Sequence, residues 1–163
     1  MNFNNLTLEK IFRAFKWARN NTIKIFEEGA KNNVLDYKSS ASKEVSYTFQ
    51  PIIFQFQCII TTTDTYYRKI ISSKNKKFGI LIRDNIIIQK KDIQKDKIKN
   101  LLNEQLIALE NLLKNFDEKQ TEENVNSIQV IVNHEYLHQG QLIVMFREAG
   151  VDLPQRFKKA FAL

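Results

Sequence analysis

Apolar residues recur at every third or fourth position through most of the chain, which is the spacing of one face of a helix. The pattern predicts four long helices, at about residues 6–28, 50–73, 91–116 and 124–149. In the second of these, many β-branched residues would individually favour a strand. A strand of about 20 residues would be exceptional, so a helix is predicted there as well.

The ends of the first and last helices carry residues that commonly cap helices. Thr7 is expected to cap the start of the first helix and Gly29 to end it. Gly150 is expected to stop the fourth helix. The tail that follows is expected to pack back on the core through its large apolar residues, which are Leu153, Phe157 and Phe161.

Three polar or irregular segments connect the predicted helices. Residues 32–46 are rich in Ser, Asn and Lys, and residues 117–123 are almost wholly polar, so both predict loops. Within residues 74–89, apolar residues alternate and Asp84-Asn85 can turn the chain. This alternation predicts a short extended hairpin between the second and third helices.

Together these elements predict an all-α four-helix bundle. A chain of 163 residues is the size of one compact domain and can bury a substantial core. We find no internal repeat and no shift of composition that would mark a linker. We therefore expect residues 1–163 to form a single domain.

Composition removes several classes of function. The four glycines stand apart from one another, so neither a P-loop nor a glycine-rich dinucleotide motif can form. A single cysteine excludes internal disulfides and zinc knuckles, in keeping with a reducing cytoplasm. The first residues lack the apolar stretch of a signal peptide, and no run approaches the ~20 apolar residues of a membrane helix. We expect a cytoplasmic protein that does not enter the membrane.

The chain is basic, with 25 Lys and Arg against 18 Asp and Glu and a formal charge of +7. A basic balance can indicate nucleic-acid binding. The lysines are spread along the chain, however, and are seldom interleaved with aromatic residues that could stack on bases. Nucleic acid is therefore not the expected partner.

The segment HEYLH holds both histidines of the chain, His134 and His138. Four residues apart on a helix, the two rings share one face and can reach the same metal ion. The letters also match the zinc-peptidase motif HExxH, in which Glu135 would be the general base. A metzincin would need glycine and histidine where Gln141 and Val144 stand, and no recognisable third ligand follows, so a peptidase is not favoured.

The residues around this pair carry a different likeness. The stretch NHEYLHQGQLIVMFREAGVDLP, residues 133–154, resembles the last helix of the DinB/YfiT-like superfamily of metalloenzymes. Shared features are two histidines four apart, a following Gly-Gln-apolar sequence, and a glycine and a proline after the helix. The resemblance implies a four-helix bundle that holds one divalent ion, commonly with a third histidine from the second helix. It also implies a homodimer, and a thiol transferase or thiol-dependent isomerase activity in some members.

This chain departs from that pattern because its second helix has no histidine. The helical stripes place Gln57 first for the empty ligand position and Gln55 second. Asp64 lies on the stripe of Gln57 and would substitute if the helix slides along its axis. A glutamine oxygen is a poor ligand for a divalent transition metal, so such a site would bind metal weakly.

Several residues near the histidines have two interpretations each. Gln141 shares their face, and it is expected to lie behind the ligands and to hydrogen-bond either a ligand or a neighbouring helix, for example at Gln105. Glu135 is either a proton acceptor or, as its residue type favours, part of a solvated face. Cys58 is either a reactive thiol near the site or, as favoured, a buried inert one. Gly140 is expected to allow the close approach of a second helix.

Two functions follow from these observations. The first is a metal-dependent enzyme that uses Zn²⁺ or Ni²⁺ for thiol-transfer or hydrolase-like chemistry on a small molecule, with His134, His138 and Gln57 as ligands. The second is a non-catalytic bundle that acts as a binding or dimer-forming module. In this case the two histidines are core residues hydrogen-bonded to their neighbours, and the metal site has decayed.

Overall fold

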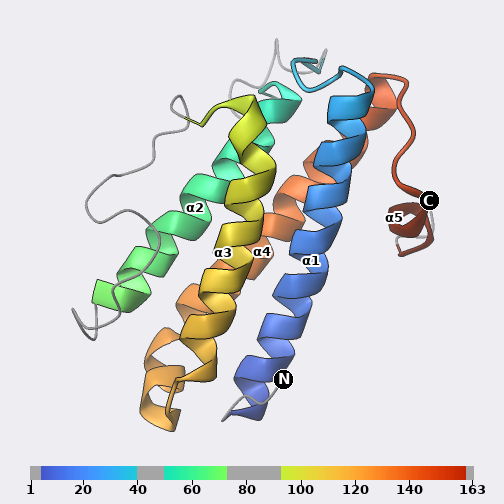
Figure 1. Ribbon diagram of the computed structural model, residues 1–163. Helices are drawn as coiled ribbons and strands as arrows, with labels where there is room; N and C mark the ends of the chain where they lie inside the picture. The colour runs from blue at the N-terminus through green and yellow to red at the C-terminus, as the bar shows by residue number, and fades with distance from the viewer. Residues whose placement is uncertain (1–4, 40–49, 73–92, 161–163) are drawn as a thin grey trace.

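Four long helices lie side by side in the computed structural model, which describes residues 5–39, 50–72 and 93–160 (Figure 1). These residues contain no strand, which confirms the all-α prediction for this part of the chain. The predicted hairpin at 74–89 lies wholly outside the described residues. The helices are α1 (Leu6–Lys31), α2 (Ile52–Ser72), α3 (Ile98–Lys114), α4 (Glu118–Glu148) and the short α5 (Gln155–Ala160), with one 3-10 turn at Lys95–Lys97 before α3.

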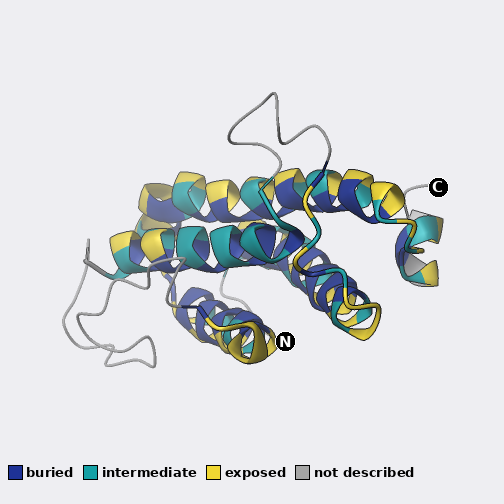
Figure 2. Ribbon diagram, turned by 90° about the horizontal axis from the view of Figure 1, so that it is seen from above, coloured by how far each residue is buried: buried dark blue, intermediate teal, exposed yellow. Residues whose placement is uncertain are grey.

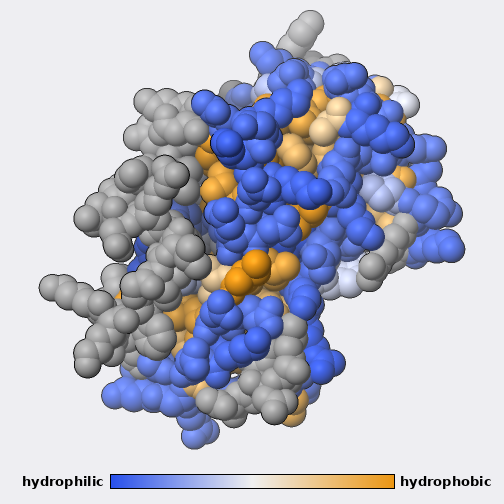
Figure 3. Space-filling view, viewed as in Figure 1, coloured by the Kyte–Doolittle hydropathy of each residue, from blue (hydrophilic) through white to orange (hydrophobic). Residues whose placement is uncertain are grey.

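Each of α1 and α2 packs against both α3 and α4. This arrangement gives every long helix two neighbours, so each must present a broad inward face rather than a single stripe. Seen from above, buried residues line the sides of the helices that face one another and exposed residues lie outside (Figure 2). The face shown in Figure 3 is mostly hydrophilic, with apolar groups visible between the helices. No helix in the described ranges is both long enough and apolar enough to cross a membrane.

The start of α1 and the start of α4 differ from the predictions. Asn5, not Thr7, caps α1, because its side chain accepts hydrogen bonds from the backbone N–H groups of Thr7 and Leu8. α4 begins at Glu118 rather than near residue 124. Asp117 and Gln120 form a capping box there, so the polar run that predicted a loop is the first turn of the helix.

Glycine also acts differently at the two helix ends. Gly150 ends α4 as predicted, with φ at 68° and the N–H of Val151 bonded to the carbonyl of Phe146. Gly29 does not end α1, which continues to Lys31 and closes through Asn33 at φ 56°. Asparagine is among the few residues that enter this left-handed conformation readily.

The tight packing predicted at Gly140 occurs instead at Gly29, where side chains rather than a helix backbone come close. A Cβ at Gly29 would lie 2.8 Å from Leu35 Cδ2 and 3.0 Å from Phe146 Cζ. Gly140 is exposed, and a Cβ there would meet nothing within 4 Å. The prediction for Gly140 is therefore wrong, and Gly29 is the residue whose missing side chain lets neighbouring groups pack.

The core consists of two hydrophobic clusters with a polar layer between them. One cluster lies toward the C-terminal end of α1 and the start of α2, and it includes Phe26, Phe56 and Phe146. The other lies toward the N-terminal end of α1 and includes Phe12 and Leu109. Buried polar residues occupy the middle of every long helix between the clusters, and they include Arg19, Thr22, Thr63, Gln105, Glu135, His138 and Gln139.

The tail after α4 packs on the core, as predicted, through the residues that the structure describes. Leu153 is 6% exposed and Phe157 is 1% exposed, and both belong to the first cluster. Phe161, the third residue expected to pack there, lies outside the described residues.

Candidate metal centre

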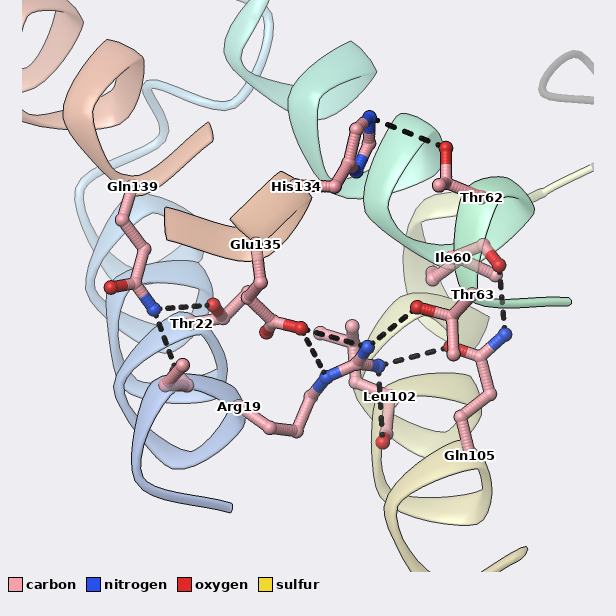
Figure 4. A network of polar contacts seen from close by, with 11 residues as sticks. Arg19, Thr22, Ile60, Thr62, Thr63, Leu102, Gln105, His134, Glu135 and Gln139 are labelled. Carbon is pink, nitrogen blue, oxygen red and sulfur yellow. Dashed lines mark hydrogen bonds and ion pairs between the residues drawn. The ribbon is translucent and has the colours of Figure 1, made fainter. Parts of the chain in front are cut away.

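The two histidines of α4 face Cys58 and Thr62 of α2, the helix that packs beside α4. The Nε2 atom of His134 lies 3.2 Å from His138 Nε2, 3.7 Å from Cys58 Sγ and 3.3 Å from Thr62 Oγ1. One donor atom from each of Cys58, His134 and His138 lies within 4.8 Å of the others. Figure 4 shows His134 and Thr62 pointing toward each other between the two helices.

Two of the three distances between these donors are close to those around a tetrahedral zinc ion, and the third pair, Cys58 and His138, lies within 4.8 Å. With Zn–N near 2.05 Å and Zn–S near 2.3 Å, tetrahedral angles place two nitrogens about 3.3 Å apart and a nitrogen and a sulfur about 3.6 Å apart. The corresponding distances here are 3.2 and 3.7 Å. A thiolate and two imidazoles also form a donor set that suits zinc and other borderline or soft ions better than magnesium or calcium.

Gln55, rather than Gln57, lies against the histidines. The Oε1 atom of Gln55 is 2.7 Å from His138 Nδ1, and the residue is 1% exposed. Gln57 donates instead from Nε2 to the backbone carbonyl of Ile93, at 3.0 Å. α2 lies between α3 and α4, so its stripes face different neighbours, and helical periodicity alone does not say which stripe faces the histidines.

Cys58 is the residue of this cluster for which sequence analysis favoured an inert, buried thiol. It is half-buried, and its sulfur lies at the Nε2 atom of His134. Of the two interpretations left open for this thiol, the structure therefore supports the one that places it near the site. The signal was its position three residues after Gln55 and four before Thr62, on the face of α2 that turns toward α4.

Glu135 faces Arg19 of α1 rather than this cluster and is fully buried. The expectation of a solvated face is wrong, because its Oε2 atom accepts a hydrogen bond from Arg19 Nε at 2.9 Å and forms an ion pair with Arg19 Nη2, also at 2.9 Å. The side chains of Glu135 and Arg19 are both 0% exposed. A carboxylate held in this way is a structural ion pair, and the geometry gives no support to its role as the general base.

Burial and the charge of the partner shift the pKa values of Glu135 and Arg19 in opposite directions. Burial raises the pKa of Glu135, while the positive charge of Arg19 and hydrogen bonds from Thr22 and Arg19 lower it. Burial lowers the pKa of Arg19, and Glu135 opposes that shift. The two charges therefore depend on each other to remain in the core.

Arg19 joins all four long helices (Figure 4). Besides Glu135 of α4, its guanidinium donates to Thr63 Oγ1 of α2 at 2.9 Å and to Gln105 Oε1 of α3 at 3.0 Å. Gln105 in turn donates to the carbonyl of Ile60, at 2.8 Å. The predicted partner of Gln105 was Gln141, but Arg19 and Ile60 fill that role.

Sequence reasoning missed Arg19 and the polar layer that it organises. A signal was present, because Arg19 follows Phe12 and Phe15 at helical spacing and so falls on the inward face of α1. The neighbouring Gln139 of α4 donates to the carbonyl of Ala18 and to Thr22 Oγ1.

The two remaining polar residues that were predicted near the histidines, Asp64 and Gln141, make no hydrogen bond to them among the described contacts. Asp64 is buried and accepts a hydrogen bond from Arg68 Nε at 2.8 Å, one turn along α2. Gln141 is half-buried, and its Oε1 atom is buried without a hydrogen-bond partner among the described residues. Neither residue is placed as a ligand by these contacts.

No protein-family model matches the chain, and neither a curated protein nor a solved structure shows significant similarity to it. The functional argument therefore rests on the geometry of the cluster itself.

Proposed function

We propose that Cys58, His134 and His138 bind a divalent transition metal, with Zn²⁺ preferred over Ni²⁺, and that the chain is a metal-dependent enzyme of the DinB/YfiT-like type. The observation that carries the proposal is the convergence of three donor atoms from two helices within 4.8 Å of one another, with His134 Nε2 at 3.2 Å from His138 Nε2 and 3.7 Å from Cys58 Sγ. Cys58 takes the ligand position for which Gln57 was first considered. The proposed substrate is a small thiol or electrophile, and the proposed assembly is a homodimer.

Three protein ligands leave a fourth position open, which is the arrangement of catalytic rather than structural zinc sites. A divalent ion held there would lower the pKa of a thiol or a water molecule toward neutrality. One thiolate and two neutral imidazoles leave one positive charge on such a centre, which favours an anionic group in the open position. The hydroxyl of Thr62, 3.3 Å from His134 Nε2, is a hydrogen-bonding group available to that anion.

The alternative is a non-catalytic bundle with a decayed site, and one observation favours it. The ring nitrogens of His138 already have polar neighbours without a metal, namely Gln55 at Nδ1 and His134 at Nε2. The rings of the two histidines also meet edge to face, with centroids 4.4 Å apart. Metal content separates the two functions.

The test uses untagged protein that has been stripped with a chelator and titrated with zinc. We expect one zinc ion per chain, and we expect bound zinc to protect the thiol from iodoacetamide by at least tenfold in rate. Since Cys58 is the only cysteine, the alkylation assay reports on this residue alone. Cys58→Ser should weaken zinc binding by at least tenfold, and His134→Ala should abolish the protection.

Two controls sharpen this experiment. Thr65→Ala changes an exposed residue on the same helix and should leave zinc affinity unchanged. Magnesium should neither bind nor protect, because thiolate and imidazole are poor ligands for it. Less than about a tenth of an ion per chain after reconstitution, or alkylation that zinc does not slow, would support the decayed bundle instead.

A further inference from the structure

The side chain of Gln55 bridges two groups, and these contacts determine how its amide is turned. Its Nε2 atom donates to the backbone carbonyl of Gln50 at 3.3 Å, and its Oε1 atom lies 2.7 Å from His138 Nδ1. A backbone carbonyl can only accept a hydrogen bond, so the NH₂ end of the amide must face Gln50. The oxygen is then the end that faces the histidine.

This orientation determines the tautomer of His138. An amide oxygen can only accept, so His138 Nδ1 must carry the hydrogen of this contact. A neutral imidazole has one N–H group, so Nε2 of His138 carries no hydrogen and can only accept or coordinate. That nitrogen is the atom that lies 3.2 Å from His134 Nε2, inside the cluster of metal donors.

The two histidines are therefore not equivalent in the metal-free protein. Two bare nitrogens at 3.2 Å would repel each other, so one of them must carry a hydrogen. Since His138 Nε2 is bare, the hydrogen belongs to His134 Nε2. His138 needs no change of tautomer to coordinate a metal, whereas His134 must first lose the hydrogen that its Nε2 donates to His138 Nε2 or move it to Nδ1.

We propose that Gln55 is a positioning residue for the metal centre, an inference that rests on the proposed function. By accepting the Nδ1–H of His138, Gln55 holds that ring in the tautomer and orientation whose Nε2 lone pair can bind the ion. Groups that hold a ligand in this way are a general requirement of metal sites, and their loss typically costs 10–100-fold in affinity.

The chain supplies a matched control two residues away. Gln57 is the same residue type on the same helix, and its amide bonds the carbonyl of Ile93 rather than a histidine. Gln55→Leu and Gln57→Leu each remove one amide of equal size from α2; the first loses the contacts with Gln50 and His138, and the second loses the contact with Ile93. Only the first removes an acceptor from His138. Gln55→Glu keeps that acceptor and serves as the rescue.

The first measurement uses metal-free protein and does not depend on zinc binding. Long-range ¹H–¹⁵N correlation spectra at about pH 8.5, where imidazoles are neutral, show which ring nitrogen of each histidine carries the hydrogen. With two histidines in the chain, the spectrum contains two rings. We expect His138 in the Nδ1–H form in the wild type, in Gln57→Leu and in Gln55→Glu, and in a mixed or Nε2–H form in Gln55→Leu.

The second measurement is zinc affinity for the same four proteins, with helix content checked by circular dichroism. Gln55→Leu should bind zinc about 10–100-fold more weakly than the wild type, while Gln57→Leu should remain within about threefold. Gln55→Glu should bind at least as tightly as the wild type, because a carboxylate acceptor makes the imidazole more basic.

The results separate this inference from the proposed function. If Gln55→Leu keeps the Nδ1–H form of His138, or loses no more affinity than Gln57→Leu, the positioning role is refuted while zinc binding by the wild type still stands. A wild type that binds no zinc refutes the proposed function, and the positioning role falls with it. A tautomer change that accompanies weaker zinc binding in Gln55→Leu alone supports both.

Discussion

The buried pair of Arg19 and Glu135 allows a quantitative prediction for the stability of the fold. Arg19→Met keeps much of the side-chain volume but removes the charge and every hydrogen bond that the guanidinium makes. Glu135 then remains in the core as a charge without its partner, and Thr63 and Gln105 each lose a donor. The damage is therefore electrostatic and reaches all four long helices.

Breaking a buried ion pair by removing one partner typically costs about 3–5 kcal/mol. The side chains of Arg19 and Glu135 are both 0% exposed, so solvent does not screen the remaining charge. A domain is usually stable by about 5–15 kcal/mol, and the single variant should fold with much of that margin removed. Arg19→Met combined with Glu135→Leu removes both charges, and its stability should return to within about 2 kcal/mol of the wild type.

Urea unfolding followed by circular dichroism at pH 7.5 measures these differences. The control is Arg13→Met, which breaks a second Arg–Glu pair on the same helix, with Glu9 at 2.6 Å. Arg13 is 72% exposed there, so its loss should cost no more than about 0.5 kcal/mol. The two variants change the same residue type in the same way and differ in burial.

Two results would refute the reasoning. If Arg19→Met lowers the free energy of unfolding no more than Arg13→Met does, the Arg19–Glu135 pair is hydrated or its two charges are not both present. A double variant that loses the sum of the two single losses would show that Arg19 and Glu135 do not interact, since coupling energy appears as departure from additivity.

Two further predictions concern pH and glycine. Burial raises the pKa of Glu135 and Arg19 opposes this shift, so without Arg19 the folded-state pKa of Glu135 should stand further above its unfolded value of about 4.3. The loss of stability in Arg19→Met is then fully present at high pH and is relieved as the pH falls through the folded-state pKa toward about 4.3, so its urea stability should approach that of the double variant on acidification. A gap between the two variants that stays constant with pH would contradict a buried carboxylate. Gly29→Ala should lower the free energy of unfolding by about 1–3 kcal/mol, because its Cβ would press on Phe146. Gly140→Ala has open space around its Cβ and should raise the free energy of unfolding by up to about 1 kcal/mol. Thermal melts that rank the two variants in the opposite order would contradict the contacts at Gly29.

The existence of the helices could be predicted because periodic apolar positions report directly on which residues must be buried. Their ends were harder to predict, because a cap is a local competition between neighbouring residues. Thr7 and Asn5 are both good capping residues, and the structure uses Asn5. Gly29 is a residue type that often ends a helix, but here the helix continues past it. Its missing side chain instead leaves room for Phe146 to pack against α1.

The histidine pair could be predicted from spacing alone, because both residues lie on one helix and helix geometry relates them. The partner on α2 could not be predicted in the same way. It depends on how α2 is rotated and shifted against α4, which is a property of the packed bundle. Helical periodicity therefore reduces the candidates for the residue facing the histidines to a few, among them Gln55, Gln57 and Cys58. The packing of α2 against α4 determines which of them faces the histidines.

That packing is constrained by polar contacts as much as by apolar ones. Apolar faces tolerate sliding and repacking, whereas a buried ion pair must stay in register or leave a charge without a partner. α4 presents Glu135 to Arg19 on one side and His134 to α2 on the other, from adjacent residues. A slide of α4 by one turn would separate Glu135 from Arg19 and His134 from Cys58 together. The register that satisfies the buried charges is consequently the register that brings the metal donors together.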